Sequence, residues 1–517
     1  MSKRLRNFLG NGVLVGVAVG VSLIAAELGF RTIDGYRLGQ LQLVPVANSS
    51  TVLPATASLS DARHSMFNKE FDIAWFATDP PNYDRSPHFS PPADWDQAIK
   101  NYKKAPGERA FVESELKFLY NDKWLEDACR TGNKETRILR YFKRYPGFVY
   151  SFRSPDGSIN PPYRIVPRGW DSLSTYYNNF GFRGPDIVPR KPDRVIRLAF
   201  LGASTTANGW PFTYPEYVVH FLRQWARADK LDVEFDLINA GRGGTNAPII
   251  TNILRYEVMP LRPDIVVYYE GANDLHVKPI VQRLDGKQED RSRPNAFMEL
   301  HYLPLEQYSA LLVRTYALLF RRGGPAAEPP KPPHRLTFDL KQTDPDLTRM
   351  DLPFNLPEQI ADLRRMAKVT QAGKAIFFMT SFITLVEDGM QLDPERDRLI
   401  LSALNNEYAP LTYAETRSAV DFQNAVFRKL AKTEHWPFLE VDRYFPQDPT
   451  YFGDMVHFKT SNGFRLHGWI VAQLLAPYIK NAIAAGRLPR AGIEPNPEAT
   501  RWATEPPTKF DLSCYPD

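Results

Sequence analysis

Alternation of strand-type and helix-type segments between residues 194 and 485 constrains the fold of this chain more than any other feature. Short apolar runs of strand length are separated by longer segments whose apolar side chains recur at helical spacing. This order is typical of a parallel sheet with right-handed crossovers. The expected strands are Ile196–Leu201, Val233–Asn239, Ile265–Tyr269, Ala375–Thr380 and Phe438–Val441, and the expected helices are Tyr214–Asp229, one after Asn246, Glu358–Gln371, Glu415–Thr433 and Gly463–Ala485.

The segments outside this alternation set the expected domain boundaries. Residues 31–190, rich in aromatics and prolines, are predicted to form an irregular accessory region, partly helical from Pro106 to Asp122. The α/β domain should cover residues 191–486, interrupted by an insertion at 275–356 that carries a Pro-rich connector. A Pro-rich tail, 487–517, follows.

The N-terminus predicts a single membrane anchor within residues 1–30. Lys3, Arg4 and Arg6 precede an apolar stretch from Val13 to Ala26. Counted with its flanks the stretch has about 20 residues, which is near the minimum for a membrane-spanning helix. The basic flank should stay in the cytoplasm, so that the large domain faces the periplasm or the exterior. A cleaved signal peptide is the alternative, and it places the domain on the same side.

Charge and cysteine content exclude several classes of function. The 64 basic and 59 acidic residues leave a net charge of +5, which is too weak and dispersed to predict nucleic-acid binding. No CxxC or Cys/His pattern predicts a metal site, and no cofactor is expected. Cys129 and Cys514 could pair in an oxidising compartment or remain two unrelated thiols.

A serine follows the first expected strand at a tight turn. Gly202 and Ala203 are small enough for the backbone to turn sharply before Ser204. Chemistry in open parallel α/β sheets collects at this carboxyl end of the strands. The alternative is a serine that only caps the next helix.

Three further segments, each in a loop after an expected strand or before the last helix, carry the other groups that acyl transfer needs. A serine nucleophile requires a base such as His457, held by a carboxylate such as Asp454. Gly244 and Asn273 can offer N–H donors to an oxyanion. Each segment alone is a weak signal. The glycine turn at 241–244 fails as a dinucleotide loop, because Asn246 stands where the third glycine belongs.

Taken in order, these segments resemble the SGNH, or GDSL-type, hydrolase family. The matching blocks are Gly202–Ser204, Asn239–Gly244, Gly271–Asp274 and Asp454–His457. Asn179–Gly184 also resembles a segment of membrane-anchored bacterial members. Ala203 departs from the family, in which aspartate is common. The α/β-hydrolase motif Gly-x-Ser-x-Gly is excluded, because Thr206 occupies the position of its second glycine.

The resemblance implies a flavodoxin-like three-layer α/β/α domain that hydrolyses carboxylic esters, including lipids, thioesters, small esters and acetylated glycans. Acylated cell-surface glycans are the first substrate hypothesis. Ser204 would be the nucleophile, His457 the base and Asp454 its orienting group. The backbone N–H groups of Ser204 and Gly244 and the side chain of Asn273 would form the oxyanion hole. An O-acyltransferase with the same site and a non-catalytic binding or assembly module are the alternatives.

Four other polar residues near these blocks have competing interpretations. His276 is expected to be a loop or surface histidine rather than a substrate contact. Arg242 could meet an anionic substrate, but a solvated arginine is favoured. His467, on the last helix, is expected to be structural, and Glu270 is a candidate for a hydrogen bond within the site.

Overall fold

The computed structural model describes two compact units of the chain. The described residues are 3–33, 55–85, 149–151, 163–165, 167–169, 176–209, 211–274, 343–352, 354–387 and 412–492, with a few single positions between them. Unit 1 draws on residues 1–58 and 298–332, and unit 2 on residues 59–297 and 333–517. The helix expected at 106–122, both cysteines and His276 lie outside the described residues.

Unit 1 contains the long helix α1 (Lys3–Ile33), which covers the residues of the expected anchor. Its Glu27 carboxylate binds Arg31 Nε at 2.7 Å and accepts hydrogen bonds from Ser309 Oγ at 2.7 Å and the backbone N–H of Leu311 at 2.9 Å. Within the described part of the chain, no helix is both long and apolar enough to cross a membrane. The structure therefore does not show the transmembrane helix that the sequence predicts.

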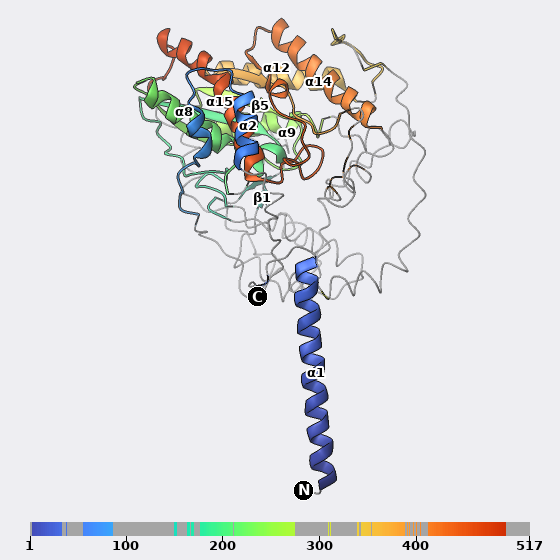
Figure 1. Ribbon diagram of the computed structural model, residues 1–517. Helices are drawn as coiled ribbons and strands as arrows, with labels where there is room; N and C mark the ends of the chain where they lie inside the picture. The colour runs from blue at the N-terminus through green and yellow to red at the C-terminus, as the bar shows by residue number, and fades with distance from the viewer. Residues whose placement is uncertain are drawn as a thin grey trace, which may run out of the picture. The chain divides into compact units, whose positions relative to one another are not determined.

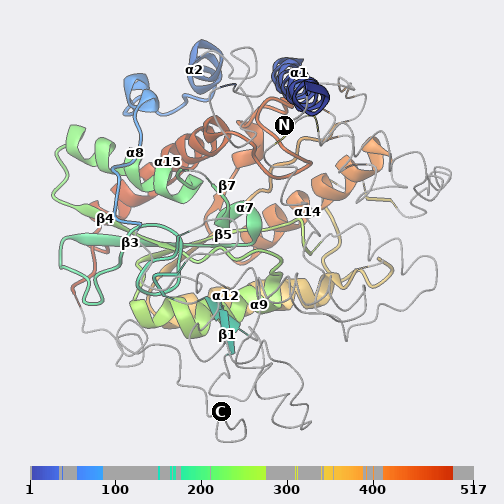
Figure 2. The ribbon, with the colours of Figure 1, turned by 90° about the horizontal axis from the view of Figure 1, so that it is seen from below.

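Unit 2 is built on a five-stranded parallel sheet, seen in Figures 1 and 2. The strand order is β4-β3-β5-β6-β7, so β3 lies between the two strands that follow it in the chain. Numbered from β3, the order is 2-1-3-4-5, which is that of flavodoxin-like sheets. The strands are β3 (Val195–Gly202), β4 (Glu234–Asn239), β5 (Ile265–Tyr269), β6 (Ile376–Thr380) and β7 (Phe438–Leu439).

Helices cover both faces of this sheet. Figure 2 shows α8 and α15 on one side of the sheet and α9 and α12 on the other. The expected α/β/α layering is thereby confirmed, with boundaries shifted by a few residues. The last strand is shorter than expected because Val441 already begins a 3₁₀ turn, η5 (Val441–Arg443). The helices are α8 (Tyr214–Ala228), α9 (Ala247–Ile253), α12 (Leu356–Ala372), α14 (Tyr413–Thr433) and α15 (Ser461–Ala484).

Two capping boxes explain where the sequence begins its helices. Thr213 and Glu216 cap α8, each side chain binding the other's backbone N–H, and Thr412 and Glu415 do the same for α14. Each pair satisfies two N–H groups that a helix start leaves without partners. Loss of such a cap costs about 1 kcal/mol.

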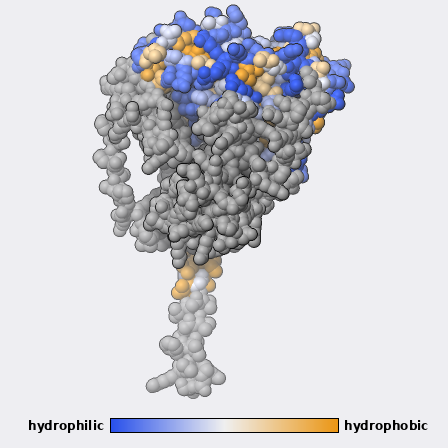
Figure 3. Space-filling view, turned by 180° about the vertical axis from the view of Figure 1, so that it is seen from behind, coloured by the Kyte–Doolittle hydropathy of each residue, from blue (hydrophilic) through white to orange (hydrophobic). Residues whose placement is uncertain are grey.

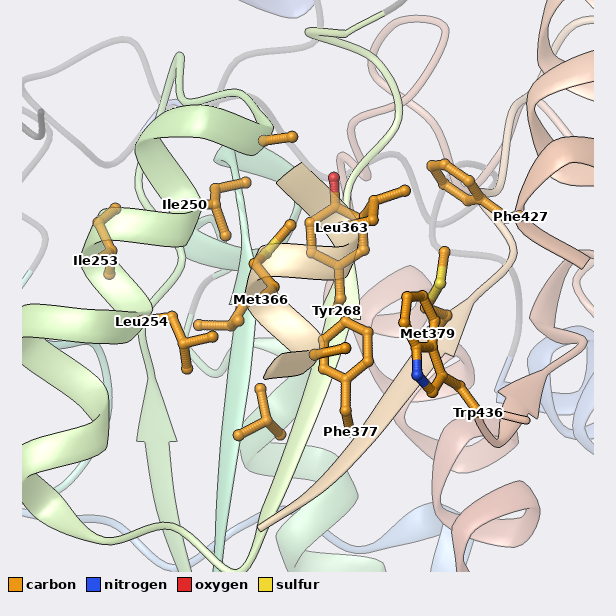
Figure 4. Close-up of a cluster of buried hydrophobic side chains, with 14 of the residues drawn as sticks. Ile250, Ile253, Leu254, Tyr268, Leu363, Met366, Phe377, Met379, Phe427 and Trp436 are labelled. Atoms are coloured by element: carbon orange, nitrogen blue, oxygen red, sulfur yellow. The ribbon is translucent and has the colours of Figure 1, made fainter. Parts of the chain in front are cut away.

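The core on one face of the sheet joins α9, α12 and α14 (Figure 4). Each large apolar side chain that is fully buried there contributes about 1.5–3 kcal/mol relative to the exposed state. This layer holds the strands together and so fixes the position of their carboxyl ends. The labelled members in Figure 4 are Ile250, Ile253, Leu254, Tyr268, Leu363, Met366, Phe377, Met379, Phe427 and Trp436.

On the opposite face, residues 59–85 pack against α8 and α15. This segment holds the end of α2 (Ala55–His64) and the 3₁₀ turn η1 (Ile73–Ala77). Phe71 lies against both Trp225 and Trp469 in the buried aromatic cluster. The indole of Trp225 donates to Glu70 at 2.9 Å. Part of the expected accessory region therefore belongs to the same compact unit as the α/β domain.

Where Figure 3 colours residues of unit 2, they are mostly hydrophilic, and the hydrophobic residues among them form small, separate patches. Among the described residues of this unit, the large apolar side chains that are exposed come from unrelated segments: Phe67, Val188, Met350 and Tyr478. Such scattered residues do not define an interaction surface.

Candidate active site

The turn that carries Ser204 packs tightly against the ends of β4 and β5, the two strands that flank β3. Ser204 opens a single helical turn, α7 (Ser204–Ala207), directly after β3. A Cβ atom on Gly202 would collide with the carbonyl oxygen of Tyr269 and the side chain of Thr206. A Cβ atom on Gly241 would lie 2.5 Å from the backbone nitrogen of Ala207. Only glycine permits these close approaches of backbone to backbone.

The structure brings Ser204 together with the Asp454–His457 pair, which lies about 250 residues later in the chain. Ser204 Oγ is 2.7 Å from His457 Nε2. On the other side of the ring, His457 Nδ1 is 2.7 Å from Asp454 Oδ2. This is the hydrogen-bonded order of hydroxyl, imidazole and carboxylate that a base-activated serine requires. The imidazole is one-third exposed, so a substrate can reach it.

The electrostatics of the pair favour a charged Asp454. Burial alone would raise the pKa of this carboxyl, but hydrogen bonds from the His457 ring and from the backbone N–H groups of Val456 and His457 outweigh burial and lower it. An ionised carboxylate can accept hydrogen bonds but cannot donate them. Asp454 therefore selects the tautomer of His457 with hydrogen on Nδ1. Nε2 then carries the lone pair that accepts the proton of the Ser204 hydroxyl.

Gly244 and Asn273 lie on the loops that follow β4 and β5, the two strands flanking β3. Gly244 has a φ of +71°, a left-handed conformation that glycine adopts without strain. The Asn273 side chain donates through Nδ2 to the carbonyl oxygen of Thr245 at 2.9 Å. This bond ties the two loops together at the carboxyl end of the parallel sheet, the end at which Ser204 follows β3. Since an amide carries two N–H donors, Asn273 can offer the second to a ligand.

Glu270 makes the hydrogen bond that the sequence suggested. Its Oε1 atom accepts the backbone N–H of Asn273 at 2.7 Å, and only 1% of the residue is exposed. Burial, reinforced by the charge of Asp274, raises the pKa of Glu270 to about 8, although hydrogen bonds from backbone N–H groups, that of Ala203 among them, oppose the shift. Glu270 therefore holds the backbone of Asn273 in place from a buried position.

Two other residues named from the sequence are buried. Arg242 is not solvated, so the favoured interpretation was wrong: its guanidinium binds both oxygens of Glu257, at 3.1 and 2.6 Å, in a buried ion pair. The counter-charge comes from the π-helical turn η2 (Leu254–Val258), which the sequence pattern did not reveal. His467 is fully buried and stacks on Tyr214, with ring centroids 3.9 Å apart, in agreement with a structural role.

The side-chain amide of Asn239, for which no role was predicted from the sequence, is buried behind the Ser204 turn. Asn239 Nδ2 donates to the carbonyl oxygen of Thr206 and to Thr213 Oγ1, both at 3.1 Å, while its Oδ1 accepts the N–H of Gly241. The available signal was a polar residue at the last position of a strand, directly after the apolar pair Leu237 and Ile238. As for metals, no group of three or more potential ligands gathers within the described residues.

Comparison with known proteins gives a resemblance in architecture at low identity. No protein-family model matches the chain, and no curated protein matches it. A GDSL-like lipase from Bacteroides thetaiotaomicron is 15% identical, with a TM-score of 0.28 over 56% of this chain and 89% of its own.

Two further solved structures give similar values. A lipase/acylhydrolase from Enterococcus faecalis is 15% identical, with a TM-score of 0.29 over 55% of this chain and 96% of its own. An acetylxylan esterase from Geobacillus stearothermophilus is 13% identical, with a TM-score of 0.28 over 55% and 96%. Because these scores lie below 0.5, the functional proposal rests on the geometry of the site.

Proposed function

We propose that the chain is a serine esterase of the SGNH type, with Ser204 as the nucleophile, His457 as the base and Asp454 as its orienting group. The observation that carries the proposal is the continuous path from Ser204 Oγ through the His457 ring to Asp454, with 2.7 Å at each step. A surface serine has no such partners. The contacts also favour transfer of the proton from Ser204 to His457. The lowered pKa of Asp454 keeps its carboxylate charged, and this charge stabilises the protonated imidazole.

The reaction follows from these contacts. Ser204 Oγ attacks the carbonyl carbon of an ester while His457 Nε2 takes its proton. The carbonyl oxygen becomes an oxyanion, which the N–H groups of Ser204 and Gly244 and the amide of Asn273 would stabilise. His457 then returns the proton to the departing alkoxide, which leaves an acyl group on Ser204. Water, activated in the same way by His457, releases the acid and restores the serine.

Substrate classes that fit this chemistry are small esters, lipids and acetylated glycans. The chemistry of the site requires an ester carbonyl that can reach Ser204 and the proposed oxyanion donors. An acceptor hydroxyl in place of water would make the same site an O-acyltransferase. An assay with an added acceptor therefore distinguishes hydrolysis from acyl transfer.

The test combines turnover with covalent labelling of the full-length protein in detergent. Wild-type protein should hydrolyse p-nitrophenyl acetate and react with a fluorophosphonate probe, whereas Ser204→Ala should do neither. Ser418→Ala, on helix α14, is the matched control and should behave as wild type, because among the described residues its hydroxyl binds the carbonyl of Ala414 in its own helix. Acyl transfer to an added oligosaccharide in excess of hydrolysis would favour the transferase. Undiminished turnover and labelling in Ser204→Ala would reject Ser204 as the nucleophile and favour the alternative of a non-catalytic binding module.

We also propose that the chain is held in a membrane by its N-terminal segment, with the catalytic domain on the outer side. The support is the order of Lys3, Arg4 and Arg6 before the apolar residues from Val13 to Ala26. Protease added to spheroplasts should digest the large domain together with a periplasmic control protein. Protection of the domain while that control is digested would reject the outward orientation.

A further inference from the structure

We infer that Arg183 is a positioning residue for the reaction: its guanidinium holds the end of the turn that begins with Ser204 and so fixes the direction of the serine hydroxyl. Arg183 lies in the segment 179–184, about twenty residues before the nucleophile, and the proposed mechanism gives it no part. The inference rests on the proposed function of Ser204.

The contacts of Arg183 are directed at backbone carbonyl groups. Its Nε donates to the carbonyl oxygen of Ala207 at 3.1 Å, and its Nη2 donates to that of Gly209 at 2.7 Å. A third, longer bond of 3.3 Å joins Nη1 to the carbonyl oxygen of Tyr176. The residue is 4% exposed, and within the described residues it forms no salt bridge. The two shorter of its three side-chain hydrogen bonds thus go to the chain that follows Ser204.

The turn needs such support because α7 has only four residues. A helix of one turn is not stable by itself, since the cost of fixing its backbone exceeds the gain from its few hydrogen bonds. The carbonyl groups at its end also lack partners within the helix. Arginine suits this place, because its planar fork carries five donors and its charge is favourable at the carboxyl end of a helix.

Arg183 is itself held rigidly, so it can transmit a fixed position. Its backbone N–H donates to the carbonyl oxygen of Asn239, whose side chain binds the carbonyl oxygen of Thr206. Ahead of it, Asn178 Oδ1 accepts the N–H groups of Phe180 and Phe182 at 2.9 and 3.1 Å. Arg183 and Asn239 together therefore clamp three carbonyl acceptors at the end of the turn and just beyond it: those of Thr206, Ala207 and Gly209.

Release of this clamp should affect the chemical step more than substrate binding. The Ser204–His457 contact of 2.7 Å survives only if the turn keeps its place, and a displacement of 1 Å at a reacting group can cost about 10²-fold in rate. Substrate contacts made elsewhere remain. Loss of the guanidinium in Arg183→Met should thus lower kcat by about 10²-fold with little change in KM.

Arg197→Met is the matched control. Arg197 is equally buried, and it donates to the carbonyl oxygens of Leu261 and Val188 as well as to Asp236, but it lies near the start of β3, at the opposite end from Ser204. Both substitutions remove a buried arginine and should lower the melting temperature. Only Arg183→Met should lower kcat and the rate of fluorophosphonate labelling in the fraction that is folded. Arg183→Lys, which keeps the charge but lacks the fork, should recover part of the labelling rate.

The outcomes separate this inference from the proposed function. If Ser204→Ala retains labelling, the proposed function fails, and the clamp has nothing to position. If Ser204→Ala is silent and folded Arg183→Met labels at the wild-type rate, the inference about Arg183 is overturned while the function stands. An equal loss of labelling in Arg197→Met would also overturn it, because the effect would then be general destabilisation. Should Arg183→Met fail to fold, Arg183→Lys decides: about tenfold slower labelling supports the clamp and wild-type labelling rejects it.

Discussion

Asp454 binds His457 through both of its carboxylate oxygens. Oδ1 accepts the backbone N–H of His457 at 2.7 Å, and Oδ2 lies 2.7 Å from Nδ1 of the ring. One side chain therefore fixes both the place of the histidine in the chain and the orientation of its imidazole. The spacing of three residues between Asp454 and His457 allows both contacts, because the chain turns between them and brings the imidazole close to the carboxylate that also binds the backbone N–H of His457.

This double contact predicts a large effect of Asp454→Asn on the proposed reaction. The amide oxygen can still accept the two backbone N–H groups, so the loop should keep its shape. The amide nitrogen then faces Nδ1 as a donor and favours the tautomer with hydrogen on Nε2, which cannot take the proton of Ser204. We expect kcat to fall by about 10⁴-fold in a protein of nearly unchanged melting temperature. A folded Asp454→Asn variant with wild-type kcat for p-nitrophenyl acetate would contradict the assigned role.

Substitution of Asn273 tests the oxyanion hole. Asn273→Ala removes the donor proposed for the oxyanion and should raise the barrier of the chemical step by about 2.7–4 kcal/mol. Asn273→Asp is the sharper variant, because it keeps the size of the side chain while replacing the N–H donors by an acceptor. It should be at least as slow as Asn273→Ala, measured as kcat in folded protein. An Asn273→Asp variant more active than Asn273→Ala would show that the amide acts by shape alone.

Much of the fold was predictable because the local sequence patterns mark the same strands and helices that a parallel sheet with crossover helices requires. Thr213 and Glu216 mark a helix start in the sequence and cap α8 in the structure. The approach of Ser204 and His457 was predictable from topology, since parallel strands bring their carboxyl ends to one edge. The burial of Arg242 was not, because its partner Glu257 lies in an irregular π-helical turn. The packing of residues 59–85 against α8 and α15 was not predictable either, because aromatic contacts between distant segments leave no periodic pattern in the sequence.

Gly202→Ala tests the crowding at the end of β3. The added methyl group would meet the carbonyl oxygen of Tyr269, a backbone atom held in β5, so the strands must separate or the turn must shift. Overpacking of this kind costs about 1–3 kcal/mol, and here it should also slow fluorophosphonate labelling of Ser204. Gly453→Ala, next to Asp454, is the control, because its nearest neighbour would be 3.4 Å away. Equal melting temperatures and labelling rates for the two variants would refute the steric account.

Glu270 predicts how stability depends on pH. Its pKa in the folded protein is about 8, against an ordinary value of 4.5, because burial disfavours the charged carboxylate and Asp274 adds repulsion. The folded state therefore binds this proton more tightly than the unfolded state does. The contribution of Glu270 to stability is fully present below about pH 4.5 and is lost progressively as the pH rises to about 8.

Glu270→Gln should remove this part of the pH dependence. Glutamine keeps an oxygen to accept the N–H of Asn273 but cannot ionise, so the variant should gain melting temperature relative to wild type as the pH rises from 5 to 8. Above pH 8 the difference should level off, because both states of the wild type are then ionised. Asp421→Asn, at an exposed position on α14, is the control and should give a curve parallel to that of the wild type. Parallel curves for Glu270→Gln as well, measured by thermal unfolding at each pH, would show that Glu270 does not titrate in this range.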